Sequence, residues 1–196
     1  VIQRVLMKYI AELNLNFDKE FCEQWILQSP LELDDREIKR WFKNVPVDDA
    51  LRNHFGPITD YLNDVVMIAT MFPKVDTNLH ADGAGTNINN TYQVALNIPV
   101  RNCNITTKTI FWDFEDERPI EYISHERWGV REIVDKDKLI RVQEYVLEDK
   151  AVLIRNEYPH SVENNNEEVR QILSWRFKPG YSWEQSIEIC KELNLL

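Results

Sequence analysis

The chain lacks several features that would assign it to a specialised class of protein. It has no run near the roughly 18 consecutive apolar residues that a membrane-spanning helix needs. Lys and Arg number 23 against 33 Asp and Glu, so the formal net charge is −10. A surface of that sign repels nucleic-acid backbones and anionic membranes at long range. We therefore expect neither a nucleic acid nor a membrane among the partners.

Cysteine and glycine are also scarce. The three cysteines, Cys22, Cys103 and Cys190, form no CxxC pair and no zinc-binding spacing, which is typical of free thiols in a reducing compartment. The first residues lack the basic start, long apolar stretch and cleavage site of a secretory signal. These absences favour a cytoplasmic protein. The five glycines are scattered, and there is no repeat or low-complexity tract.

What is present is ordinary for one globular domain. The 196 residues are 43% hydrophobic and 29% charged, which suffices for a proper core. The first third has helical spacing. Residues 2–13 carry an apolar stripe, Asp18 is placed to cap a second helix, and 32–43 predicts a third amphipathic segment. We predict a single domain, 1–196, in which 1–61 is mostly helical support.

From residue 62 onward the pattern changes to short β-branched and aromatic segments separated by turn-rich stretches. The expected strands cover 65–72, 92–100, 107–114, 141–146, 151–155 and 169–177. Such spacing is typical of an antiparallel sandwich or barrel. Ser182 with Gln185 forms a capping box, which predicts a C-terminal helix within 179–196. The fold class is therefore mainly β with flanking helices, with a barrel core over 62–178.

Two histidines and one carboxylate stand out among the polar residues. His80 and Asp82 are two positions apart, so both side chains point to one face of an extended segment. Gly83 and Gly85 follow and predict a turn at the mouth of a barrel. His160, far downstream, is the candidate third ligand from another strand. This ligand set holds ferrous iron and leaves the opposite positions open for reactants.

An arginine follows at a suggestive distance. Arg170 comes ten residues after His160 in an apolar segment, where a buried guanidinium needs an anion such as an acidic co-substrate. Arg176 is its rival, because residues six apart share a face of a regular strand. Asn97 lies in the strand after the His-x-Asp turn. Its amide either faces inward to a co-substrate or is satisfied by the backbone.

Each of these residues taken singly fits a structural or incidental role, and their joint order and strand context point to a site. The remaining histidines compete poorly. His54 precedes the strand-rich region and suits a capping or surface role. His125 lies in a charged stretch, which indicates a solvent-facing side chain or one at the substrate entrance.

With these residues the chain resembles the iron(II)/2-oxoglutarate-dependent dioxygenases, whose core is a double-stranded β-helix (jelly-roll, cupin-like). The resemblance covers roughly residues 62–178. It is carried by His80, Asp82, His160 and Arg170. More narrowly, three segments are similar to uncharacterised oxygenases of marine bacteria and phages: Asn78–Gly83, Ala95–Val100 and Pro159–Asn164.

The resemblance implies a function as well as a fold. Iron(II) is held by His80, Asp82 and His160, and 2-oxoglutarate chelates it while Arg170 pairs with the far carboxylate. Dioxygen then drives oxidative decarboxylation of 2-oxoglutarate coupled to hydroxylation of a substrate. That substrate, a small molecule or an amino-acyl group, is not identified by the sequence.

Two other functions fit parts of the pattern. A non-catalytic jelly-roll module that binds an acidic ligand needs Arg170 but tolerates loss of the metal ligands. A cupin-type metalloenzyme without 2-oxoglutarate uses a different metal, but that class usually offers more histidine ligands than this chain places well.

Overall fold

The computed structural model describes residues 7–29, 40–82, 93–116, 118–125 and 130–196. Its strands are β1 (Ile10–Glu12), β2 (Arg40–Pro46), β3 (Val65–Met71), β4 (Ala81–Asp82), β5 (Val94–Arg101), β6 (Thr107–Phe114), β7 (Tyr122–His125), β8 (Val130–Ile133), β9 (Leu139–Val146), β10 (Val152–Arg155), β11 (His160–Asn164) and β12 (Arg170–Arg176). The helices are α1 (Lys19–Gln28), α2 (Asp49–Phe55) and α3 (Trp183–Glu192), with 3-10 turns η1 (Gly56–Tyr61) and η3 (Lys136–Lys138). Among these residues no helix is long and apolar enough to cross a membrane.

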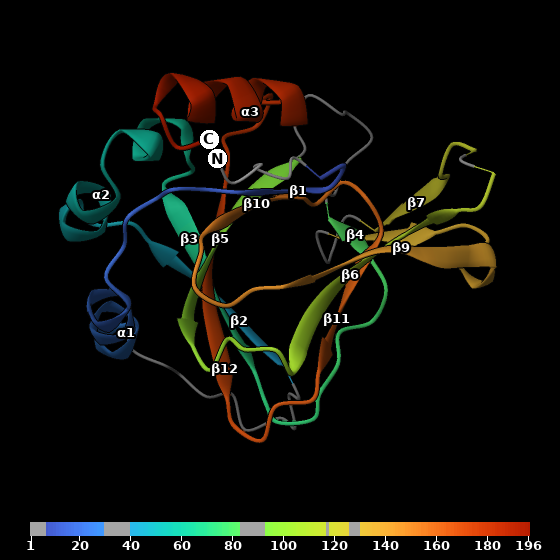
Figure 1. Cartoon of the computed structure of the whole chain (residues 1–196), viewed down its shortest axis with the longest axis horizontal. Helices are drawn as coiled ribbons and strands as arrows, with labels where there is room; N and C mark the ends of the chain where they lie inside the picture. The colour runs from blue at the N-terminus through green and yellow to red at the C-terminus, as the bar shows by residue number, and fades with distance from the viewer. Residues whose placement is uncertain (1–6, 30–39, 83–92, 117, 126–129) are drawn as a thin grey trace, which may run out of the picture.

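Two antiparallel sheets face each other across a central space (Figure 1). The larger has the order β1-β10-β5-β12-β3-β2 and the second has the order β11-β6-β9. The segment before β4 extends the second sheet, because His80 forms a bridge with His160 at the start of β11. Early strands therefore pair with late ones: β3 and β5 flank β12, while β6 and the segment before β4 flank β11. This is the winding of a jelly roll, and it confirms the predicted double-stranded β-helix core.

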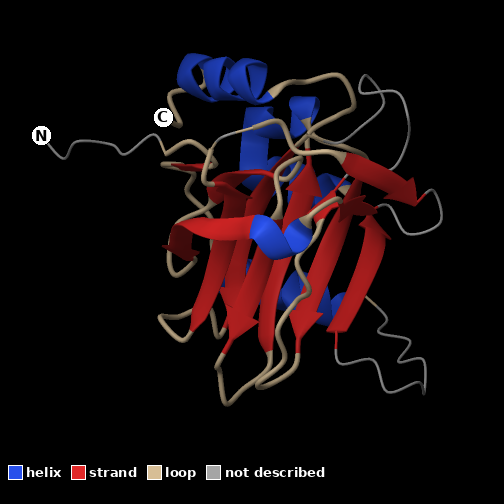
Figure 2. Ribbon diagram, turned by 90° about the vertical axis from the view of Figure 1, so that its right-hand side faces the viewer, coloured by secondary structure: helices blue, strands red, loops and turns tan. Residues whose placement is uncertain are grey.

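The larger sheet is buried on both faces. Its outer face packs under the helices, and Leu173 and Trp175 of β12 belong to that core together with Ile187 of α3. Its inner face lines the space between the sheets, where Ile172 packs with Phe111 of β6. Successive strand residues point to opposite faces, so Arg170, Ser174 and Arg176 share the inner face with Ile172. Figure 2 shows the helices set against the outside of the upright strands.

The predicted helix over residues 2–13 is wrong for the part that is described. Ile10–Glu12 is a strand, paired with Val152–Ile154 of β10. Tyr9 and Ile10 pack in the inner core, whereas Ala11 and Leu13 pack in the outer one, so the segment is apolar on both sides. An apolar run buried on both faces cannot be distinguished from a helix by periodicity alone, and here β10 supplies the backbone partners.

The predicted third helix, 32–43, falls mostly outside the described residues, and its described end is also a strand. Residues from Arg40 onward belong to β2, which pairs along the whole of β3. The free edge of β3 offers unpaired N–H and C=O groups, and pairing with them overrides helical preference. The expectation of a mostly helical 1–61 is corrected accordingly: α1, α2 and η1 are accompanied by two strands.

The other predicted helices and strands are found, whereas the turn predicted at Gly83 and Gly85 lies outside the described residues. Asp18 caps α1 by accepting from the backbone N–H groups of Glu20 and Phe21, and Ser182 with Gln185 forms the capping box of α3. The six predicted strands correspond to β3, β5, β6, β9, β10 and β12, each within two residues at either end.

Candidate metal centre

The two predicted histidine ligands face each other across neighbouring segments. The backbone N–H of His80 donates to the carbonyl of His160 at 3.0 Å, and that of His160 donates to the carbonyl of His80 at 2.7 Å. The ring centroids are 4.5 Å apart. Asp82 follows on the same side, and ligand atoms of His80, Asp82 and His160 all lie within 4.8 Å of one another. The structure thus brings the three predicted ligands together.

Both imidazole rings are oriented by the backbone. Nδ1 of His80 lies 2.7 Å from the carbonyl oxygen of Asn78, and Nδ1 of His160 lies 2.8 Å from that of Tyr158. A carbonyl oxygen only accepts, so each Nδ1 carries the hydrogen. The Nε2 lone pairs are left available, which is the tautomer of a metal-binding histidine whose second nitrogen is held by an outer partner.

The charges around the ligands suit a cation. Burial alone raises the pKa of the Asp82 carboxyl, but the positive charge of Arg176, followed by the two histidines, outweighs burial and holds the pKa below its usual value. Burial and then the neighbouring His80 lower the pKa of His160 to about 4. Near neutral pH the site therefore presents a carboxylate and a neutral imidazole, the forms that coordinate metal.

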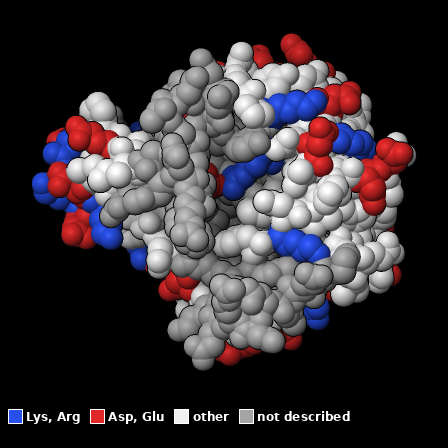
Figure 3. All heavy atoms as spheres, turned by 180° about the vertical axis from the view of Figure 1, so that it is seen from behind, with Lys and Arg blue, Asp and Glu red and all other residues white. Residues whose placement is uncertain are grey.

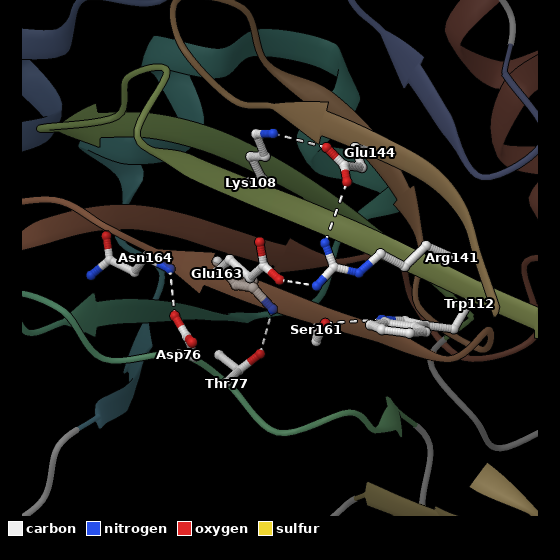
Figure 4. Close-up of polar contacts among 10 residues, drawn as sticks. Asp76, Thr77, Lys108, Trp112, Arg141, Glu144, Ser161, Glu163 and Asn164 are labelled. Atoms are coloured by element: carbon white, nitrogen blue, oxygen red, sulfur yellow. Dashed lines mark hydrogen bonds and ion pairs between the residues drawn. The ribbon is translucent and has the colours of Figure 1, made fainter. Parts of the chain in front are cut away.

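The segment that carries His80 is fixed along β11 by polar contacts (Figure 4). The Thr77 hydroxyl accepts from the backbone N–H of Val162 at 2.6 Å, and the Asp76 carboxylate accepts from that of Asn164 at 2.8 Å. The backbone N–H of Thr77 in turn donates to the Val162 carbonyl at 2.8 Å. These contacts set the register that places His80 opposite His160.

Arg170 is a buried cation with no carboxylate partner among the described residues. It begins β12, its residue is 3% exposed, and its Nε has no hydrogen-bond partner within the described part of the chain. One terminal nitrogen of the guanidinium lies 3.4 Å from the sulfur of Met71. Burial lowers the pKa of Arg170, and the Cys103 thiol beside it opposes that shift. No acidic side chain in the described part of the chain pairs with it, so the predicted need for an anion is unmet within these residues.

Two asparagines add further unpaired polar atoms. Oδ1 of Asn97 and Nδ2 of Asn156 are, with Arg170 Nε, the buried side-chain atoms that lack a partner among the described residues. Asn97 pairs with Ser174 and shares its inward-facing position in the sheet. Asn156 follows β10, and its carbonyl accepts from the N–H of Asp82 at 2.9 Å. Nothing in the sequence singles out Asn156; its place beside Asp82 depends on the fold.

The comparisons with known proteins give similar folds at low identity. No family model matches the chain, and no curated protein sequence matches it. A Pseudomonas putida prolyl-4-hydroxylase is 15% identical over 87% of this chain and 92% of that one, with a TM-score of 0.47. A Burkholderia pseudomallei oxidoreductase of the 2OG-Fe(II) oxygenase family is 11% identical over 81% and 77%, with a TM-score of 0.48. An oxalate decarboxylase from Lactobacillus farciminis is 11% identical over 80% and 33%, with a TM-score of 0.41. The strand order establishes the fold. Similarity at this level of identity and TM-score gives no information on the function or the site residues.

The donor set fits a divalent first-row metal. Two neutral imidazole nitrogens and one carboxylate oxygen, all from one end of the barrel, form a half-shell of the kind that ferrous iron accepts. The face opposite the view of Figure 1 is hollowed, with basic and acidic side chains at the hollow's edge (Figure 3).

Aromatic side chains pack next to His160, and the sequence did not predict the contribution of Tyr9. Tyr9 stacks on Phe111 with centroids 5.0 Å apart, and Phe111 lies 6.0 Å from the His160 ring. Tyr158 also packs against Tyr9, at 5.0 Å. The Tyr9 hydroxyl donates to Asp113 at 2.8 Å, which anchors this part of the chain. The helical interpretation of residues 2–13 concealed the contribution of Tyr9.

Among the described residues, no other histidine joins the group of His80, Asp82 and His160. His54 lies in the last turn of α2, accepts at Nε2 from the backbone N–H of Asp18 at 3.0 Å and stacks on Phe21, so it packs against the start of α1. His125 ends β7, and its side chain lies outside the described residues.

Proposed function

We propose that this protein is an iron(II)- and 2-oxoglutarate-dependent oxygenase that hydroxylates an organic substrate, either a small molecule or an amino-acyl group. One observation carries the proposal. The buried guanidinium of Arg170, which has no carboxylate partner among the described residues, lies on the inner face of the same barrel that gathers His80, Asp82 and His160. A metal site alone does not require such a cation, whereas a site for a metal-chelating dicarboxylate does.

Different residues of the site would bind the metal and the co-substrate. His80 and His160 would hold iron through Nε2 and Asp82 through a carboxylate oxygen, which leaves the opposite face open. Arg170 would pair with the far carboxylate of 2-oxoglutarate, and Asn97 would offer it a hydrogen bond. When bound, iron with dioxygen and 2-oxoglutarate supplies the oxidation, releasing succinate and carbon dioxide as the substrate is hydroxylated. The packed aromatic rings of Tyr9, Phe111 and Tyr158 exclude water from the side of the barrel next to His160.

Two alternatives explain fewer observations. A cupin-type metalloenzyme without 2-oxoglutarate leaves the buried charge of Arg170 without a function. A non-catalytic module that binds an acidic ligand accounts for Arg170 but not for two imidazoles held with Nε2 free beside an ionised carboxylate. Binding of 2-oxoglutarate with and without Mn²⁺ separates these cases, because chelation requires the metal and plain anion binding does not.

The decisive test removes a ligand. We expect His80→Ala and Asp82→Ala to lose succinate release from 2-oxoglutarate and to bind iron weakly, because each removes one of three protein ligands. Succinate is measured with purified protein, Fe(II) and 2-oxoglutarate, and metal content by elemental analysis. His54→Ala is the matched control, since His54 contacts Asp18 at the start of α1 and is not one of the three grouped ligands. Undiminished succinate release in the two ligand variants would refute the proposal.

A further inference from the structure

We propose that Arg176 is a positioning residue for the metal, holding one oxygen of Asp82 so that the other oxygen faces the histidines. The inference rests on the metal site of the proposed function. A terminal nitrogen of Arg176 lies 2.5 Å from Oδ2 of Asp82, and their side chains are only 20% and 13% exposed. The other oxygen, Oδ1, lies 3.7 Å from Nε2 of His80. The guanidinium of Arg176 and the imidazole of His80 thus approach different oxygens of one carboxylate.

This division has a consequence for coordination. A carboxylate can bind a metal through one oxygen or through both. With Oδ2 occupied by a charge-assisted hydrogen bond, Asp82 offers a single oxygen beside the Nε2 atoms. One-oxygen binding keeps the opposite positions open, and that is where a chelating co-substrate and dioxygen must fit.

The backbone at Arg176 is hydrogen-bonded to segments on both sides, which fixes the position from which its side chain extends. The carbonyl of Arg176 accepts from the N–H of Asn63 at 2.9 Å, and the next N–H, of Phe177, donates to Val94 at 3.0 Å. Arg176 also pairs with Ala95 in the register of β12 with β5. Phe177 is buried in the outer core, which anchors the end of the strand.

Arg176 and Arg170 therefore perform different tasks from the same strand face. Arg170 has no acidic partner among the described residues, whereas Arg176 is committed to Asp82. Arg176 acts before any co-substrate binds, because its contact with Oδ2 holds the Asp82 side chain in place. Outer partners of metal ligands typically contribute about 10–100-fold to metal affinity or activity.

The test measures metal binding without 2-oxoglutarate. Chelator-stripped protein is titrated with Mn²⁺ alone, and we expect Arg176→Ala to raise the Kd on the order of 10–100-fold. Arg176→Lys should recover much of the affinity, because an ammonium can still contact Oδ2, and Arg176→Gln should lie between Lys and Ala. The absorption spectrum of bound Co²⁺, which depends on coordination number, should change in Arg176→Ala because both Asp82 oxygens become available.

Two further variants make the result specific. Arg141→Ala is the matched control: Arg141 pairs with Glu144 and Glu163 on the second sheet, where its side chain is 46% exposed (Figure 4). It should leave the Mn²⁺ Kd and the Co²⁺ spectrum unchanged. Arg170→Ala should leave Mn²⁺ binding intact and lose 2-oxoglutarate binding.

The outcomes separate this inference from the proposed function. If the wild type binds no Mn²⁺, the proposed metal site itself is wrong. If the wild type binds Mn²⁺ and Arg176→Ala matches it in Kd and Co²⁺ spectrum, only the positioning role is overturned. Should Arg176→Ala fail to fold by circular dichroism, Arg176→Gln decides, and wild-type affinity with a wild-type spectrum in that variant overturns the role.

Discussion

At the scale of single residues, the buried charge of Arg170 lowers the stability of the fold and suits the binding of an anionic ligand. A charge buried without a partner is unfavourable, and the effective penalty is several kcal/mol per ion even after relaxation. Arg170 is 3% exposed and has no acidic partner among the described residues. A fold under selection for stability alone has no use for it. The residue makes physical sense as one half of an ion pair whose other half is a ligand.

This tension predicts the behaviour of Arg170→Met, which keeps most of the length and removes the charge. Without ligand the variant should be as stable as the wild type or more stable, by on the order of 1–4 kcal/mol. With Mn²⁺ present, 2-oxoglutarate at 100 times its Kd should stabilise the wild type by about 2.7 kcal/mol and the variant hardly at all. Thermal unfolding with and without 2-oxoglutarate measures both effects. Equal stabilisation of the two proteins would contradict the assigned role, and Arg141→Met provides a surface control.

At the scale of elements, the sequence predicted six strands and missed six others among the described residues, of which β11 is polar. Five of the six predicted strands, β3, β5, β6, β10 and β12, bury apolar side chains, so their pattern reports their environment, whereas β9 exposes Ile140 and Val142. β11 reads His-Ser-Val-Glu-Asn and has no such pattern, although it pairs with β6 over all five residues. Its strand character comes from partners on both sides. The residue pattern of one segment does not show which other strands will pair with it.

The site shows the same limit. His80 and Asp82 were predictable as a same-face pair because their relation is local. Parity placed Arg170 and Arg176 on one face and could not separate them, since parity carries no information on which side chain meets an acid. The contact of Arg176 with Asp82 joins β12 to β4, two strands of different sheets. Only the winding of the barrel brings them together.

One element-scale contact is directly testable at Thr77. Its hydroxyl accepts from the Val162 N–H at 2.6 Å, and the residue is 8% exposed. Thr77→Val keeps the shape and removes the acceptor, so an N–H of β11 loses its partner at a cost of about 1–3 kcal/mol. We also expect weaker Mn²⁺ binding, because this bond sets the register of His80 with His160. Denaturant unfolding and Mn²⁺ titration measure the two effects, and Thr77→Ser should behave as the wild type. A Thr77→Val protein with normal stability and metal affinity would show that the register has another cause.

At the scale of the whole molecule, the helices and the outer face of the larger sheet share one buried cluster. Leu13, Leu51, Trp175 and Ile187 come from the N-terminal segment, α2, β12 and α3, and all belong to the same buried cluster. Backbone hydrogen bonds link Leu13 to Ala151 and Asn14 to Leu195. Figure 1 shows α2 and α3 on the outer side of the larger sheet, to which β12 belongs. Loosening one of them therefore exposes apolar surface on the others.

The shared core predicts that the chain unfolds as a unit, as expected for one domain over 1–196. Ile187 of α3 is 5% exposed, and Ile187→Ala should remove about 2–5 kcal/mol of stability. For a domain of this size that corresponds to a fall in Tm of roughly 5–15 °C. Because these elements share a buried cluster, the temperature at which the barrel loses Mn²⁺ should fall by the same amount as the Tm measured by circular dichroism. The calorimetric and van't Hoff enthalpies of unfolding should also agree. Glu188→Ala, on the exposed side of the same helix, should leave the Tm nearly unchanged. If Ile187→Ala melts α3 in a separate, earlier transition while the barrel keeps its metal to the wild-type temperature, the helix is a separable layer and the chain is not one cooperative domain.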